Sequence, residues 1–195
     1  MGFHVSTLHN LPTGSIRHFV HVIDLSGGLH AQWIEKNLHI LARTFGKDAG
    51  LVVGPQNLTA ELYQFLKRNV TDFGAVEKLL YSATCLVISE GHLAHTQSAV
   101  YILPLSLPES SPEAHDMIDT LLRMLGDALQ TERLEEFVNE LGAVQVGLSA
   151  VGGGVLVCTL RRLNAVLELK PNFAGLGLNL NAAIEKVLPQ GTRPI

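Results

Sequence analysis

The stretch LLYSATCLVISEGHLAHTQSAVYILPL, residues 79–105, decides how this chain folds. It contains two short apolar runs with β-branched members, Cys85–Ile88 and Val100–Leu103. Runs of this kind, bounded by turn residues, are typical of strands that are buried on both faces. The polar segment between them, residues 89–98, suits a hairpin and is too short for a helical crossover. We therefore expect two neighbouring antiparallel strands.

Strand and helix patterns alternate before this hairpin. Short apolar runs predict strands at residues 19–23 and 50–53. Apolar residues at helical spacing predict helices over residues 30–45, closed by Gly46, and over residues 59–69. Because a helix joins the two strands, we expect them to lie parallel with a right-handed crossover.

A helix is also expected after the hairpin. Ser110–Glu113 is a strong start signal, because proline is tolerated in the first turn and an acidic residue is favourable there. This helix runs to about Gln130, and a shorter one follows over residues 132–141. The predicted order is strand, helix, strand, helix, strand, strand, helix.

This order resembles the thioredoxin-like fold over roughly residues 16–130. In that family the turn after the first of these strands carries Cys-x-x-Cys, and a cis-proline precedes the third strand. Here the turn Ser26–His30 has no cysteine, and Ala83 stands where the proline is expected. The resemblance implies an α/β protein with a thioredoxin-like mixed sheet flanked by helices and without thiol–disulfide chemistry. A flavodoxin-like sheet is the competing topology, and it needs a further strand and helix.

Composition narrows the class of protein. The 195 residues are 47% hydrophobic and 16% charged, which is ample for a core. With 14 lysines and arginines and a net charge of −4, the chain lacks a basic patch for phosphates, so we expect no nucleic-acid partner. Cys85 and Cys158 fall in apolar runs, which favours buried, reduced thiols. The first residues lack the pattern of a secretory signal, so we expect a cytoplasmic protein.

The character of the sequence changes at Gly142. We expect an α/β domain over residues 1–141 and an apolar, Gly-rich region over residues 142–195. Apolar residues alternate with small and polar ones in this region, and Gly152–Gly154 suits a hairpin turn. The pattern predicts a C-terminal Gly-rich β-meander that ends in a short helix.

A membrane segment is the alternative for the start of this region. Residues 141–160 carry no charge and precede Arg161–Arg162. Their number matches the roughly 20 residues of a membrane span, and the arginines fit the positive-inside pattern. Three consecutive glycines would weaken such a helix by about 1 kcal/mol each. The meander is therefore the preferred interpretation.

Histidines are the residues most suggestive of a site. His92 and His95 lie in the hairpin loop, and two imidazoles held on one side of a loop can bind Zn²⁺. Asp24 and His30, which follow the first predicted strand, are the candidates for the remaining ligands. The simpler interpretation is a polar loop with solvated histidines, so we expect no resident cofactor.

The turn before the first helix is a second candidate site. Ser26, Gly27 and Gly28 can present main-chain N–H groups to an anion at the helix N-terminus. The glycine spacing is not that of a dinucleotide-binding or P-loop motif. A tight turn that needs glycine dihedral angles is the simpler interpretation.

No set of residues in the sequence specifies a reaction. We expect a non-enzymatic protein-interaction or signalling module that binds a partner protein or forms a homo-oligomer. The ending Pro171–Asn181 resembles that of uncharacterised bacterial proteins, some of which are associated with signalling or defence gene neighbourhoods. One alternative is a membrane-associated effector or regulator that docks through residues 141–162. Another is a small metal-dependent hydrolase that uses the His92 and His95 loop.

Light scattering separates these expectations. If the C-terminal region drives self-association, the full chain forms a defined oligomer and residues 1–140 form a monomer. If that region enters a membrane, the full chain aggregates and detergent restores its solubility. A full-length monomer that is insensitive to detergent contradicts both expectations.

Overall fold

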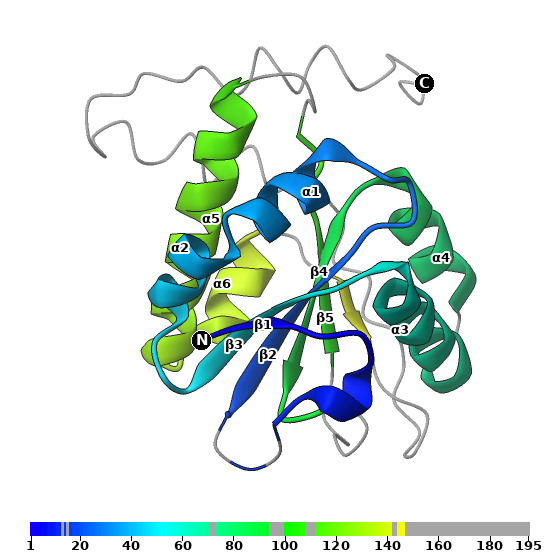
Figure 1. Cartoon of the computed structure of the whole chain (residues 1–195), viewed down its shortest axis with the longest axis horizontal. Helices are drawn as coiled ribbons and strands as arrows, with labels where there is room; N and C mark the ends of the chain where they lie inside the picture. Colours follow the sequence, from blue (N-terminus) through cyan, green and yellow to red (C-terminus); the bar gives the residue numbers. More distant parts are fainter. Residues whose placement is uncertain are drawn as a thin grey trace, which may run out of the picture.

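The computed structural model describes residues 1–12, 14, 16–70, 73–93, 100–107, 112–141 and 144–146, which form helices on both faces of one mixed sheet (Figure 1). The sheet has six strands in the order β1-β3-β2-β4-β5-β6. The strands are β1 (Gly2–His4), β2 (His18–Ile23), β3 (Ala49–Val53), β4 (Cys85–Glu90), β5 (Val100–Pro104) and β6 (Val144–Val146).

Strand directions follow the connections. β1, β3 and β2 are mutually parallel, and β2, β4, β5 and β6 pair antiparallel in turn. The parallel β2–β3 pair and the antiparallel β4–β5 pair confirm the sequence predictions. β1 was not predicted, because three residues are too few to show a periodicity.

Two layers of helices cover the sheet. The α-helices are α1 (Leu29–Lys36), α2 (Leu38–Leu41), α3 (Gln56–Asn69), α4 (Phe73–Ser82), α5 (Pro112–Gln130) and α6 (Leu134–Glu140), and the 3₁₀ helices are η1 (Leu8–Asn10) and η2 (Ala42–Phe45). Figure 1 shows α1, α2, α5 and α6 on one side of the sheet and α3 and α4 on the other. Each layer encloses its own hydrophobic core.

The helix predicted over residues 30–45 is interrupted at Asn37. The Asn37 side chain donates to the carbonyl of Trp33 at 2.8 Å, and its backbone lies outside the helical region at φ −102°, ψ 10°. A short amide side chain that bonds the main chain competes with helical hydrogen bonds. α1, α2 and η2 therefore follow one another as separate turns, and Gly46 ends the last of them at φ +66°.

The strands read as continuous apolar runs because both faces of the sheet are covered. All six residues of β2 are buried. The sequence suggests that at most one of His18 and His21 reaches the core, since they point to opposite faces. That prediction is wrong: helices on both sides bury His18 to 8% exposure and His21 completely.

The described residues end at Val146, so the rest of the predicted meander and Cys158 lie outside them. Val144–Val146 form β6, in line with their alternating pattern, and pair with β5. A truncation that tests the role of the C-terminal region should therefore remove only the residues after Val146. Within the part of the chain described, no helix combines the length and hydropathy that crossing a bilayer requires.

Two glycines allow main chain to approach main chain. A Cβ at Gly54 would lie 2.1 Å from the carbonyl oxygen of Val5, where β1 ends beside β3. A Cβ at Gly126 would lie 2.5 Å from the carbonyl oxygen of Thr44, where α5 crosses η2. Both distances are below any normal contact, so these positions set how closely the elements pack.

We predict that Gly126→Ala lowers the free energy of unfolding by about 1 to 3 kcal/mol, because α5 must move away from η2. Gly74→Ala is the matched control, since no atom lies within 4 Å of a Cβ there and Gly74 is in helix α4. The control should leave stability unchanged or raise it by up to about 1 kcal/mol. Urea unfolding of both variants measures the difference, and equal effects would contradict this account of the crossing.

Candidate functional site

One edge of β1 has no strand paired with it among the described residues. The N–H of Leu51 donates to the carbonyl of Met1 at 2.8 Å, and the N–H of Val5 donates to the carbonyl of Val53 at 3.1 Å. Hydrogen-bonding groups alternate along a strand, so the N–H and C=O groups of Gly2 and His4 face away from β3. Both residues are exposed. An edge of this kind is a template for another strand.

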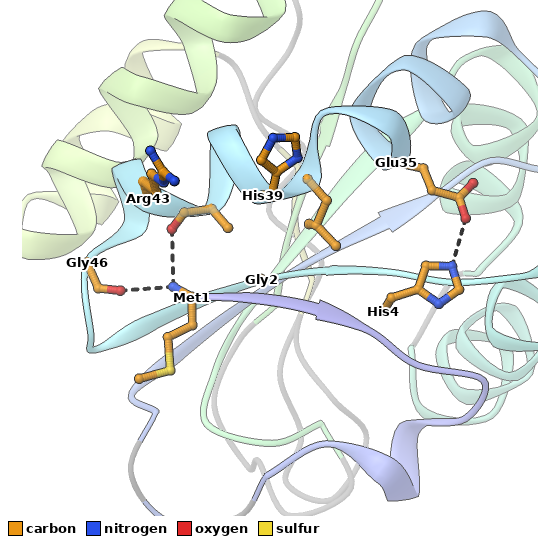
Figure 2. Close-up of a pocket in the computed structure, with 9 residues that line it drawn as sticks. Met1, Gly2, His4, Glu35, His39, Arg43 and Gly46 are labelled. Carbon is orange, nitrogen blue, oxygen red and sulfur yellow. Dashed lines mark hydrogen bonds and ion pairs between the residues drawn. The ribbon is translucent and has the colours of Figure 1, made fainter.

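A groove of ≈ 540 Å³ lies beside this edge (Figure 2). β1 forms one wall, and the helical segment from α1 to η2 forms the other. The lining residues are Met1, Gly2, His4, Glu35, Leu38, His39, Ala42, Arg43 and Gly46. Gly2 is required in this wall, because a Cβ there would lie 2.7 Å from the Cβ of Ala42. The helices therefore rest directly on the main chain of β1.

Positive groups dominate the charge of the groove. His4 Nε2 lies 2.7 Å from Glu35 Oε1, so the groove's carboxylate already has a partner. The α-ammonium of Met1 donates to the carbonyls of Ala42, Gly46 and Ala49. Among the described residues, Arg43 forms no ion pair. Its guanidinium is thus available to an acidic group that enters the groove.

The turn predicted to bind an anion is occupied by a carboxylate of the chain itself. Asp24 Oδ1 accepts hydrogen bonds from the Ser26 N–H at 2.9 Å, the Ser26 hydroxyl at 2.7 Å and the Gly27 N–H at 3.1 Å. Gly28 precedes α1 without a side-chain cap. Because Asp24 takes the donors and adds a negative charge, this turn is unsuited to an anion. The simpler interpretation, a tight turn with Gly27 at φ +75°, describes it better.

The structure separates the residues of the predicted metal site. Asp24 and His30 follow the carboxyl end of β2, whereas His92 follows β4, whose Glu90 pairs with His18 at the amino end of β2. The length of β2 therefore lies between them. In the described residues no group of three His, Cys, Asp or Glu side chains is placed to hold a metal ion.

The individual histidines have structural contacts. His92 is buried rather than solvated, and its Nε2 lies 2.8 Å from the carbonyl of Leu8, which anchors η1. His95 lies outside the described residues. His30, in the first turn of α1, is buried, and its Nε2 lies 3.0 Å from the carbonyl of Leu107. The sequence offered no signal for either carbonyl partner.

Cys85 has no features of a reactive thiol. It is free and buried in β4, and burial raises its pKa to about 12. The thiolate, which is the nucleophilic form, is therefore scarce at neutral pH. This placement confirms the expected burial of the thiol at this position.

Comparisons with known proteins give no relative. No family model matches the chain, and neither a curated protein nor a solved structure matches it.

His21 is a titratable group that is completely buried in the sheet. It lies in β2 with both ring nitrogens unpartnered among the described residues, and its ring stacks on Phe19 at 6.0 Å. Burial, with a smaller contribution from neighbouring His92, lowers its pKa from 6.5 to about 3. Burial also lowers the pKa of His18.

We predict that this histidine weakens the fold in acid. In the unfolded chain His21 takes up a proton below pH 6.5, whereas in the folded chain it does so only near pH 3. The free energy of unfolding is therefore highest above pH 6.5 and falls as the pH is lowered towards 3. His21 contributes up to about 1.4 kcal/mol per pH unit to the slope of the free energy of unfolding against pH. Urea unfolding at several pH values should show a shallower slope for His21→Leu and an unchanged slope for His9→Leu, at an exposed position. An equally steep slope in His21→Leu would assign the acid sensitivity to other groups.

Proposed function

We propose that this chain is a non-enzymatic protein-interaction module that binds an extended, acidic segment of a partner protein along the free edge of β1. The observation that carries the proposal is the outward-facing N–H and C=O groups of Gly2 and His4 beside a groove. A strand that pairs with this edge gains main-chain hydrogen bonds, and its alternate side chains enter the groove.

Charge supports the acidic character of the partner. The groove contains the imidazole of His39 and the guanidinium of Arg43, which forms no ion pair within the described part of the chain, whereas Glu35 is paired with His4. A carboxylate on the bound strand meets Arg43 in the bidentate geometry that guanidinium favours. Repulsion between Arg43 and a basic side chain disfavours basic segments, so the groove discriminates between acidic and basic partners.

A thioredoxin-like fold without redox chemistry is part of the proposal. The order from β2 to α5, which is strand, helices, strand, helices, strand, strand, helix, supports it. The turn Ser26–His30 carries no cysteine, and Asp24 is bonded within that turn. In such a module the partner binds at the edge of the sheet and not at the turn after β2, where the family has its active site. A role in signalling or defence is the setting that we propose for this binding.

The decisive experiment blocks the edge without unfolding the sheet. The N–H of His4 points outward, so His4→Pro removes a donor to the partner and no hydrogen bond to β3. His4→Ala is the matched control, since it also removes the contact with Glu35 but keeps the N–H. Peptides are selected on the wild-type chain from a random-sequence library, and the dissociation constant of each is measured by fluorescence polarisation.

We predict that the selected peptides are acidic and that His4→Pro binds them at least about tenfold more weakly than His4→Ala, because a main-chain hydrogen bond is lost. Arg43→Glu should also weaken binding, whereas Lys47→Glu, the same charge change outside the groove, should not. Equal binding by the proline and alanine variants would contradict strand addition. A dimer that only His4→Pro dissociates would identify a second copy of the chain as the occupant instead.

A further inference from the structure

The groove beside β1 carries different charges at its two ends. Figure 2 shows Arg43 and Gly46 beside Met1 at one end, and Glu35 beside His4 at the other. The guanidinium and the α-ammonium make the first end positive, whereas the second end holds the carboxylate of the groove. A strand bound along β1 therefore meets charges that distinguish its two directions.

The main chain of β1 fixes how such a strand can pair. The hydrogen bonds that Met1 and Val5 make to β3 leave the N–H and C=O groups of Gly2 and His4 facing outward. In an antiparallel pair, each of these residues exchanges both of its hydrogen bonds with the residue opposite. The residue opposite Gly2 thus donates its N–H to the Gly2 carbonyl and accepts the Gly2 N–H.

Direction decides which end of the partner meets Arg43. A strand antiparallel to β1 runs from the His4 end of the groove to the Met1 end, so its C-terminal side lies beside Arg43. A parallel strand would carry its C-terminal side to Glu35 instead, where two carboxylates would repel each other. The charges of the groove therefore favour the antiparallel direction for a strand that ends within it.

We infer that the groove binds the C-terminal end of a partner protein as an extended antiparallel strand, with the last residue opposite Gly2. The inference rests on the strand addition proposed above. One oxygen of the terminal carboxylate accepts the Gly2 N–H, and the other accepts a charge-assisted hydrogen bond from Arg43. The acidic group that the groove recognises is then the end of the partner's main chain.

The surroundings of Gly2 define the last side chain of the partner. Residues opposite each other in a strand pair project to the same face of the sheet. A Cβ at Gly2 would lie 2.7 Å from the Cβ of Ala42 and 3.2 Å from Cγ of Leu38, so this face is the apolar part of the groove. We therefore expect the last residue of the partner to be apolar.

The test compares peptides that differ only at the C-terminus. Hexapeptides are selected on the full chain from a random library with free C-termini and labelled with fluorescein at the N-terminus. Each is synthesised as the free acid, as the C-terminal amide and with a Gly-Ser-Gly extension, and dissociation constants are measured by fluorescence polarisation. Arg43→Gln removes the proposed charge partner, and Lys47→Gln, outside the groove, is the matched control.

We expect the amide and the extended form to bind at least about tenfold more weakly than the free acid, because the terminal charge is removed or displaced. The preference for the free acid should shrink in Arg43→Gln and persist in Lys47→Gln. Equal binding of acid and amide would overturn this inference, and weaker binding by His4→Pro than by His4→Ala would then leave strand addition by an internal segment. If no peptide is selected, or if those two variants bind equally, both the inference and the proposed function fail.

The direction of the bound strand is measured separately by NMR. A nitroxide at the peptide N-terminus should broaden the amide signal of Glu35 more than that of Gly46, because the antiparallel strand begins at the His4 end. Stronger broadening at Gly46 would identify a parallel strand and overturn the inference.

Discussion

Burial of β2 on both faces is the constraint on which the rest of the structure depends. This strand lies between parallel β3 and antiparallel β4, and each of its residues is covered by a helical layer. A strand in that position exposes neither edge nor face, so the chain must supply helices to both sides. β1 lies outside β3, no described strand pairs with its other edge, and the groove forms between that edge and the helices above it (Figure 2).

Apolar runs were sufficient to predict β2 to β5 and α5, because continuous burial leaves a signal that is independent of partners. Three features escaped prediction for physical reasons. β1 is too short for a pattern. Asn37 breaks a helix through a hydrogen bond to Trp33 that helical spacing does not reveal. His18 and His21 look polar, yet a sheet covered on both faces buries them with the apolar residues around them.

The candidate sites were harder to predict than the fold, since a site depends on which distant residues meet. The sequence singled out His30 as a candidate ligand, and the structure places its ring beside His115 on α5 rather than in the hairpin loop. Asp24 was expected as a candidate metal ligand, whereas its carboxylate accepts hydrogen bonds from Ser26 and Gly27 in the turn that follows it. No spacing in the sequence announces the outward N–H of His4, because strand edges are defined by tertiary pairing.

The close contacts at Gly54 and Gly126 have a consequence for recognising distant relatives of this chain. In both places a carbonyl oxygen occupies the space of a side chain, and no rotamer of a neighbour relieves such a collision. A protein can replace either glycine only by moving the two elements apart, whatever has happened to its apolar residues. Two glycines, one directly after the second apolar strand and one inside the long amphipathic helix, are thus the positions to compare first in any chain suspected of sharing this backbone.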